Sequence, residues 1–468
     1  MSEPHRQAIN EYEREPVPEK AQLGLKSYVG QFAGEHVAGT ELMIGPLFIA
    51  GGVSAFDMIF GLLLGNILAV LSWNFFTSPI AVRTRITLYY QLEKICGRKL
   101  VTLYNVVNGV MFAFLAGAMI TVSATALGVW FQFKMPGLND LLPNSLGWVI
   151  AVLGIGCLFS VIAAYGYKSV SRFANIAVPW MVMVFIAFGV IGLHELGLRS
   201  VADFWQVAQS VIWRGGEPLP GQIKLTFWHT MFFAWFCNMA WHIGMADLSI
   251  FRYARKSWYG LASASGMFVG HYMAWIAASI LFALQLHENP ANTAVLPGPL
   301  AYRACGLAGL LCVIAAGWTT ANPTLYRAGL AFQAIIPKSS RFLVTLAVGI
   351  AASITAIFPL VTMKLLDFVA LWGMILMPMG AVVFVDFWLL EKCGLERNYG
   401  ERNNGHFNWA AGLSWTITVM VCTWMVLRGN VQIYFVSLPG WFIVSLLYVL
   451  LSLFFQRRNK TDPSRAVR

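Results

Sequence analysis

The sequence predicts an all-α integral membrane protein with twelve transmembrane helices. Hydrophobic residues make up 58% of the 468-residue chain and charged residues only 11%, whereas soluble proteins average roughly 45–50% apolar and about 25% charged residues. A chain with so little charge cannot cover a water-facing surface, so this composition excludes a soluble enzyme, a disordered protein and a disulfide scaffold. Apolar segments of about 20 residues, the length of a membrane span, recur throughout the sequence.

Twelve segments have the length and apolar character of such spans. Ten carry no Asp, Glu, Lys or Arg: 58–82, 100–130, 146–166, 173–193, 258–286, 304–326, 342–363, 368–385, 407–427 and 429–456. The segments near 27–52 and 226–251 are long enough but contain polar residues. The stretch 80–96, between the second and third spans, is predicted to be an amphipathic cytoplasmic helix. The loops are too short for a separate domain.

The distribution of basic residues predicts the orientation of the chain. With the N-terminus inside, 25 of the 32 Lys and Arg residues fall in cytoplasmic segments, Arg327 among them as the first residue after span 8. An excess of Lys and Arg in the cytoplasmic loops is the usual sign of orientation. Both termini are therefore expected in the cytoplasm, and the net charge of +11 needs no nucleic-acid partner. The compact loops and short tails are typical of a bacterial inner-membrane protein.

Several classes of protein are disfavoured by what the sequence lacks. Its seven cysteines are scattered, without metal-binding spacing. No nucleophile–base constellation indicates an enzyme, and no repeated filter segment indicates a channel. A major-facilitator transporter is disfavoured because it would usually have a long basic loop between spans 6 and 7, which this sequence lacks. A sensor that retains a transporter fold stays possible, although the 12-residue basic C-terminal tail is short for a signalling segment.

Spans 1 and 6 carry polar residues and glycines where the others are apolar. Span 1 contains Glu35, His36 and Glu41 among four glycines, and span 6 contains Asn238, His242, Gly244 and Asp247. Ionisable residues inside a span usually face a cavity, and unwound backbone is tolerated only where it lines protein or water. Because the two spans lie five helices apart, the second copy would run in the opposite direction. Matching broken helices in inverted repeats are a pointer to a transporter's binding site.

Several stretches resemble the nucleobase:cation symporter-1 family, and its cytosine permeases most. They are Pro-Val-Pro at 16–18, MADLSIFRYARK at 245–256, GWTTANPTLYRAGLAF at 317–332, MPMGAVVFVDFW at 377–388 and FNWAAG at 407–412. The resemblance implies the leucine-transporter fold, with two inverted repeats of five helices plus two further helices. It divides the chain into a cytoplasmic tail (1–26), a first repeat (27–194), an external loop and second repeat (195–390), helices 11 and 12 (391–456) and a second cytoplasmic tail (457–468).

The resemblance also implies a sodium site between spans 1 and 8. In the family, backbone carbonyls of the unwound helix 1 and two adjacent hydroxyls of helix 8 bind the ion. The matching positions are the carbonyls of Gly34, Ala38 and Ala316 and the hydroxyls of Thr319 and Thr320. The alternative is that the two hydroxyls merely bond back to their own helix.

The substrate site departs from the family pattern. The positions of the family's stacking aromatic residue and nearby serine on helix 6 are Asn238 and Ala240 here, and the segment after the threonine pair lacks its carboxylate. Trp241 can supply a stacking face, with Phe112 or Phe114 opposite. The residues expected to bind the substrate are Glu35, Phe112, Phe114, Asn238, Trp241, His242 and Asn322. A planar ring with N–H and C=O groups suits this set, and a carboxylate also suits an amidine-like or cationic ligand.

Other ionisable residues are assigned with alternatives. Glu35 and His36 are expected to bind a ligand or a proton rather than to sit in a tolerated wet turn. Glu41 either belongs to the same site or reaches the external interface. His229 and His271 are expected to be buried core residues. Asp247 is expected to form an ion pair or inner gate with Arg252, one turn away, and Asp386 a similar structural pair.

The sequence therefore predicts a secondary active transporter, not an enzyme. It is expected to import a nucleobase or related small nitrogen heterocycle by sodium-coupled symport with alternating access. The alternatives are proton coupling through Glu35 or His36, and sodium-coupled import of a small amine or zwitterion. No bound cofactor is expected besides the transported Na⁺ or H⁺. The expected partners are a small-molecule substrate and the lipid bilayer, with the protein acting as a monomer.

Overall fold

The computed structural model describes residues 12–137, 140–336, 338–363, 365–403, 405–429 and 431–460. Residues 1–11 and 461–468, which belong to the two predicted tails, lie outside the described residues. Within the described ranges, nine helices are long and apolar enough to cross a membrane. Three more of the predicted spans are accounted for by one short apolar helix and two broken helices. The described residues form no β-sheet, and isolated bridges join Leu23 to Ala254 and Ser54 to Arg214.

The helices follow one another in the predicted order. The first five spans are α2 (Leu25–His36) with α3 (Glu41–Ala50), the continuous helix Asp57–Thr84 that contains α4 (Leu62–Ser72) and α5 (Ser78–Thr84), α7 (Arg98–Phe131), α8 (Leu146–Ala164) and α9 (Tyr167–Glu195). The next five are α11 (Phe227–Phe236) with α12 (Leu248–Phe251), the helix Ser257–Glu288 that contains α13 (Met273–Glu288), α14 (Pro297–Ile335), α15 (Arg341–Ala356) and α17 (Leu365–Trp388). Two further helices, α19 (Trp409–Gly429) and α20 (Ile433–Lys460), complete the bundle.

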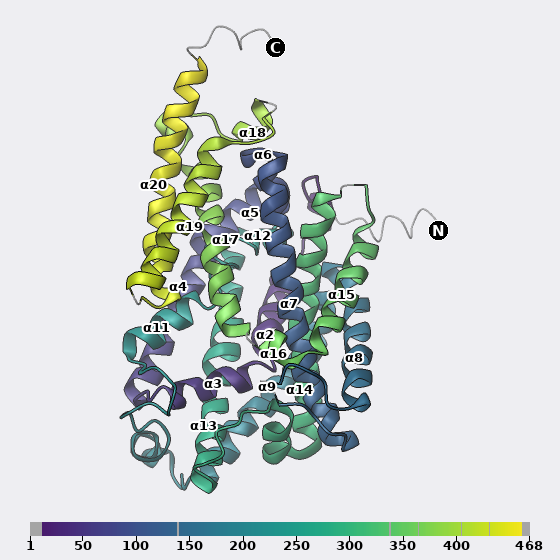
Figure 1. The fold of residues 1–468 in the computed structure, drawn as a ribbon, viewed down its shortest axis with the longest axis vertical. Helices are drawn as coiled ribbons and strands as arrows, with labels where there is room; N and C mark the ends of the chain where they lie inside the picture. Colours follow the sequence, from purple (N-terminus) through teal and green to yellow (C-terminus); the bar gives the residue numbers. More distant parts are fainter. Residues whose placement is uncertain are drawn as a thin grey trace.

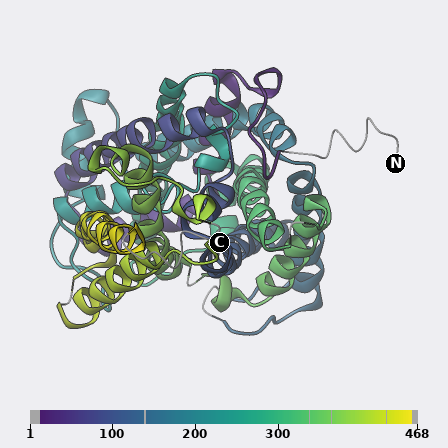
Figure 2. The ribbon, with the colours of Figure 1, turned by 90° about the horizontal axis from the view of Figure 1, so that it is seen from above.

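Short helices connect several of these spans. They are α6 (Leu88–Cys96), α10 (Phe204–Val207), α16 (Pro359–Met363) and α18 (Tyr399–Arg402). Figure 1 shows α6 and α18 at one end of the molecule, together with the C-terminal end of α20. Seen along the long axis, α19 and α20 lie side by side at the edge of the bundle (Figure 2). Two connecting segments that the sequence assigns to the cytoplasm therefore lie at the same end as the C-terminal end of α20.

The predicted helix at 80–96 is two helices. The second span continues to Thr84, and Arg85 then adopts a left-handed conformation with φ of +58°. The chain turns there, and α6 begins after Thr87, whose hydroxyl accepts a hydrogen bond from the backbone N–H of Tyr90 at 3.2 Å. Such a side-chain cap satisfies one of the free N–H groups at a helix start, and this cap explains why α6 begins anew.

Spans 1 and 6 are broken where polar residues and glycines were noted. The first is interrupted at 37–40, between α2 and α3, and the second by consecutive turns at 237–247. At Gly39 an added Cβ would lie 2.7 Å from Val122 of α7, so the first break passes too close to α7 for a side chain. In the second break, Met245 has φ of +63°. A bulky residue in this conformation is strained, and such strain concentrates at functional sites.

The helices α8 and α15 make reciprocal contacts. An added Cβ on Gly156 of α8 would meet Ser353 of α15, and one on Gly349 of α15 would meet Ser160 of α8, each hydroxyl oxygen 2.0 Å away. Each serine hydroxyl donates a hydrogen bond to the carbonyl of the glycine four residues earlier in its own helix. The two helices therefore run antiparallel at this contact, with the same Gly-x-x-x-Ser spacing on both sides.

Candidate substrate and ion site

A cavity of about 100 Å³ lies beside the two broken helices. Twenty residues line it: Glu35, His36, Ala38, Thr40, Glu41, Ile44, Leu115, Met119, Phe233, Phe236, Cys237, Asn238, Met239, Trp241, His271, Trp275, Thr320, Val369, Ala370 and Tyr434. They come from the broken spans 1 and 6, both at the breaks and in the adjoining helices, and from α7, α14, α17, α20 and the helix Ser257–Glu288. Because one water needs roughly 10–15 Å³ of such space, the cavity has room for a small organic molecule.

The break in span 1 lies against the threonine pair of α14. The hydroxyl of Thr320 is 2.9 Å from the carbonyl oxygen of Glu35 and 3.0 Å from that of Ala316, and the hydroxyl of Thr319 is 3.2 Å from the carbonyl of Ala316. An added Cβ on Gly34 would lie 3.4 Å from Thr319 Cβ, so these two residues are also in contact. The structure thus brings the predicted ion-site positions of α2 and α14 together.

The end of α2 supplies carbonyl oxygens to this junction. The last four carbonyls of a helix have no partner within it, and α2 ends at His36, with the N–H of Val37 donating to the carbonyl of Ala33. The next two carbonyls along the chain are those of Gly34 and Glu35. The carbonyl oxygen of Glu35 is the one within hydrogen-bonding distance of the Thr320 hydroxyl. Both threonine hydroxyls also bond back to α14, as the alternative interpretation expected, which leaves their oxygen lone pairs available as ligands.

Arg327 of α14 joins both broken spans through two buried carboxylates. Its Nη1 lies 2.5 Å from Glu35 Oε1 and its Nη2 3.2 Å from Glu35 Oε2, and Nη2 also donates to Asp247. The indole N–H of Trp73 donates to the other oxygen of Asp247 at 2.7 Å. Arg327 and Asp247 are fully buried, and the side chain of Glu35 is 5% exposed. The side chain of Glu35 lines the cavity with its charge already compensated by Arg327.

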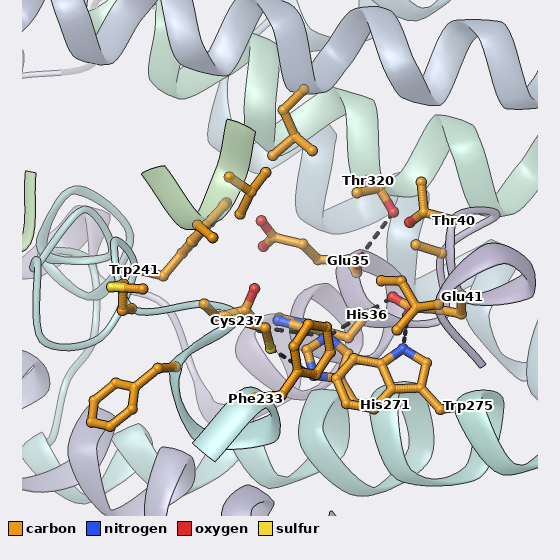
Figure 3. Close-up of a pocket in the computed structure, with 18 of the residues that line it drawn as sticks. Glu35, His36, Thr40, Glu41, Phe233, Cys237, Trp241, His271, Trp275 and Thr320 are labelled. Carbon is orange, nitrogen blue, oxygen red and sulfur yellow. Dashed lines mark hydrogen bonds and ion pairs between the residues drawn. The ribbon is translucent and has the colours of Figure 1, made fainter. Parts of the chain in front are cut away.

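A second polar group lines the opposite side of the cavity, as Figure 3 shows. Glu41, the first residue of α3, accepts a hydrogen bond from the indole N–H of Trp275. His271 Nε2 lies 3.8 Å from the other oxygen of Glu41, and the His271 ring stacks on Trp275 with a centroid distance of 4.2 Å. Glu41 is 3% exposed. Within the described residues, no lysine or arginine lies within ion-pair distance of it.

Close packing of glycines positions this second group. An added Cβ on Gly45, one turn after Glu41, would lie 2.6 Å from the Cβ of Ala278 and 2.6 Å from the carbonyl oxygen of Trp275. An added Cβ on Gly270 would lie 2.4 Å from the Cβ of His36. These glycines let α3 and the end of α2 approach the helix Ser257–Glu288 closely enough for the polar side chains to meet. The His36 and His271 rings consequently lie 4.8 Å apart.

The structure divides the predicted site residues into two sets. Glu35, Asn238, Trp241, Ala38 and Thr320 line the cavity. Phe112 lies behind Trp241, with the two rings edge to face at 5.7 Å, and Phe114 packs on Phe368. His242 contacts Trp73, and its Nε2 lies 2.8 Å from the carbonyl of Trp235. Asn322 is fully buried in α14 and is not among the residues that line the cavity. In this geometry, Phe112, Phe114, His242 and Asn322 are not positioned to touch a molecule in the cavity.

Four residues of the site were misassigned or left open by the sequence. Arg327 was counted as cytoplasmic because it follows an uncharged run, yet α14 continues to Ile335. Asp247 was paired with Arg252, but it binds Arg327. His271 is buried, as expected, but it also lines the cavity. The sequence left open whether Glu41 belongs to the site or reaches the external interface. In the structure it is buried in the cavity wall.

Within the part of the chain that the structure describes, no group of three His, Cys, Asp or Glu residues is placed to hold a metal ion. The oxygens at the junction of α2 and α14 are of a different type, since they come from carbonyls and hydroxyls. Such oxygens, freed at an unwound helix, suit a hard monovalent cation.

Comparisons with known proteins identify the fold. No protein-family model and no curated protein sequence matches the chain. Among solved structures, it is similar to Mhp1, a nucleobase-cation-symport-1 family transporter, in a closed conformation with bromovinylhydantoin bound, at a TM-score of 0.71 and 15% identity over 97% of both chains. It is also similar to a substrate-bound, outward-open Na⁺-coupled sialic acid symporter, at a TM-score of 0.68 and 15% identity over 96% of this chain and 93% of that one.

A further similar structure is the inward-facing conformation of Mhp1, with a TM-score of 0.68 and 14% identity over 95% of this chain and 93% of that chain. These similarities extend along nearly the whole length of the chain. They confirm the predicted all-α membrane fold, the leucine-transporter fold shared by these symporters, with the first and sixth spans broken beside the candidate site.

Proposed function

We propose that this chain is a secondary active transporter that imports a small nitrogen-containing heterocycle by sodium-coupled symport with alternating access. The observation that carries the proposal is the junction between the broken first span and the threonine pair of α14, directly beside a cavity lined by polar and aromatic residues. The similarity to Mhp1 and to a sodium-coupled sialic acid symporter supports a transport function.

The proposed sodium ion binds between the end of α2 and α14. Its ligands are the hydroxyls of Thr319 and Thr320, the carbonyl of Ala316, and carbonyls of Gly34 and Glu35 at the end of α2 and of Ala38 in the break. Because these oxygens belong to two different helices, an ion bound to both of them favours the conformation in which the helices meet. Ala38 and Thr320 also line the cavity. Sodium binding therefore orders the cavity wall and raises substrate affinity, which is a coupling free energy between two sites.

The substrate in this proposal lies between Trp241 and the polar residues of the cavity. The indole ring supplies a flat apolar face for a heterocycle, and Asn238 supplies an amide for hydrogen bonds. The cavity of about 100 Å³ limits the ligand to about seven to ten non-hydrogen atoms if each occupies roughly the space of one water.

The geometry of the site bears on the two alternatives, proton coupling and import of a small amine. Proton transport through Glu35 would have to break the two contacts that Arg327 makes with both carboxylate oxygens. Import of a small amine is favoured by a specific observation, the second carboxylate at Glu41, which has no lysine or arginine within ion-pair distance among the described residues. We place the protein in a bacterial inner membrane as a monomer with both termini in the cytoplasm.

Ligand-dependent thermal stability of the purified protein tests this proposal. Nucleobases, hydantoins, other nitrogen heterocycles and small amines are each measured in sodium and in choline. A ligand at 100 times its Kd stabilises a protein by about 2.7 kcal/mol. We expect at least one compound to stabilise the protein in sodium and much less in choline.

Two matched variants assign the sodium effect to its site. Thr320→Ala removes the hydroxyl that joins α14 to α2, whereas Thr324→Ala removes a buried hydroxyl one turn away that bonds only within α14, to the carbonyl of Thr320 at 2.7 Å. We expect the sodium dependence of ligand binding to disappear in Thr320→Ala and to remain in Thr324→Ala. Equal sodium dependence in both variants would rule out the proposed ion site.

A further inference from the structure

We infer that the transported substrate is a small organic cation bearing N–H donors, and that the carboxylate of Glu41 is its counter-charge. This inference rests on the proposed transport function and specifies the class of substrate. It is carried by the hydrogen-bonding capacity of the cavity wall, by its fixed charges and by its aromatic residues.

Glu41 has unused capacity to accept hydrogen bonds. An ionised carboxylate has about four acceptor positions, and the indole N–H of Trp275 occupies one of them. The other oxygen of Glu41 has His271 Nε2 at 3.8 Å, which is beyond hydrogen-bonding distance. Glu41 lines the cavity and is 3% exposed. A buried carboxylate without a lysine or arginine counter-charge is costly, so a cationic donor entering the cavity gains a strong interaction there.

The neighbouring histidine adds a second acceptor. His36 Nδ1 lies 2.8 Å from the carbonyl oxygen of Phe32. A carbonyl oxygen only accepts hydrogen bonds, so Nδ1 carries the proton, and in the neutral ring Nε2 is an acceptor. The ring lines the cavity beside His271. One donor of the same wall is already engaged, since Asn238 directs its amide nitrogen toward His271 Nε2 at 3.4 Å. A ligand that binds the acceptors of Glu41 and His36 must itself donate hydrogen bonds.

The fixed charges around the cavity favour a positive ligand. No lysine or arginine is among the lining residues. Arg327 forms ion pairs with both Glu35 and Asp247. Because one positive charge is shared by two carboxylates, this cluster supplies no positive charge to offset Glu41. The C-terminal end of α2, which carries the negative pole of its helix dipole, points to the same space. The positive N-terminal pole of α3 is already occupied by Glu41 itself.

The aromatic residues of the lining suit an organic cation as well. Phe233, Phe236, Trp241, Trp275 and Tyr434 all line the cavity. Aromatic faces attract cations, and tryptophan does so most strongly. A flat cation such as an amidinium or an aminopyridinium can therefore stack on an indole ring while donating to Glu41.

Isosteric pairs that differ in charge test the inference. Benzamidinium is compared with benzamide, and acetamidinium with acetamide, by thermal stability of the purified protein in sodium. Each pair has nearly the same shape and both members donate N–H bonds, so charge is the main difference. We expect the amidinium of each pair to bind at least about tenfold more tightly, because a charge-assisted hydrogen bond is worth about 1.5–3 kcal/mol.

Variants at Glu41 identify the counter-charge. Glu41→Gln keeps an oxygen for the Trp275 N–H and removes the charge, so the preference for the amidinium should fall at least tenfold. Glu41→Asp retains the charge and should retain the preference at lower affinity. Asp386→Asn neutralises an equally buried carboxylate that binds Asn398 and Tyr448 away from the cavity, and it should leave the preference unchanged.

The outcomes separate this inference from the proposed transport function. Sodium-dependent binding of neutral heterocycles without any response to amidinium compounds would overturn the inference and leave the transporter proposal standing. Amidinium binding that is indifferent to sodium would support the cationic substrate and remove the sodium coupling. An amidinium preference that survives in Glu41→Gln would overturn the assignment of Glu41.

Discussion

Nη1 of Arg327 lies 2.5 Å from Oε1 of Glu35, and the two residues are 292 positions apart in the sequence. This contact ties α14 to the end of α2, directly before the break in span 1. Through its second nitrogen, the same guanidinium holds Asp247 at the end of the break in span 6. One buried cation thereby fixes both broken spans against α14.

Arg327→Met should destabilise the protein severely. It leaves Glu35 and Asp247 buried without their counter-charge, and removing one partner of a buried ion pair costs about 3–5 kcal/mol. Thermal unfolding of the purified variant measures the loss. The triple variant Arg327→Met, Glu35→Gln, Asp247→Asn should recover much of it, because no uncompensated charge remains. Arg303→Met removes an arginine that pairs with Glu195 and Glu288 and is 37% exposed, and it should cost only about 0–1 kcal/mol.

Gly45→Ala should separate α3 from α13. The added methyl would lie 2.6 Å from Ala278 Cβ, and overpacking of this kind costs about 1–3 kcal/mol. Since Glu41 lies one turn away on α3, ligand binding should weaken together with thermal stability. The same change at Gly154 of α8, which has no atom within 4 Å of the added methyl, should cause no loss of either. Equal behaviour of the two alanine variants would contradict the close contact.

Cys237 should react preferentially with a cationic reagent. It lines the cavity beside His271, so the negative charge of Glu41 should attract a positive reagent. In a variant that retains only Cys237, 2-aminoethyl methanethiosulfonate should modify the thiol about tenfold faster than the 2-sulfonatoethyl reagent, relative to free cysteine. The ratio should fall in Glu41→Gln. A variant that retains only the exposed Cys393 supplies the control, and a bound amidinium should slow modification at Cys237 alone.

Cysteines in two exposed loops, predicted on opposite sides of the membrane, should show the orientation of the chain in the membrane. Cys393 is exposed in the loop after α17, and Val201, 90% exposed, lies in the loop after α9. In single-cysteine variants of intact cells, a membrane-impermeant maleimide should label Val201→Cys and leave Cys393 unmodified. Inverted membrane vesicles should show the reverse pattern. Labelling of Cys393 from outside would contradict the orientation predicted from the basic residues.

The architecture was predictable because it depends on properties of contiguous sequence. Apolar length fixes the spans, and polar residues with glycine in spans 1 and 6 mark the breaks that the structure places at 37–40 and 237–247. The spans and their breaks need no knowledge of which distant helices touch. The contact of the α14 threonines with the end of α2 was implied by the family resemblance instead, and Thr320 makes it.

The composition of the cavity was less predictable because it depends on pairings between distant residues. An arginine after an uncharged run is indistinguishable from a cytoplasmic residue until its two carboxylate partners are known. His271 becomes a lining residue because Gly266 and Gly270 let His36 approach its helix. Phe112 was expected in the cavity, but Trp241 and Trp372 cover its ring, which only the packing of three segments reveals.

The contact between α8 and α15 also bears on the origin of the chain. Gly156 meets Ser353 and Gly349 meets Ser160, so each side of the interface presents the same pair of residues to the other. This self-complementary pattern is the one that two identical subunits form about a twofold axis. At this point the two halves of the chain therefore meet as two identical subunits would, which is the pattern expected if a gene for five helices was duplicated and fused.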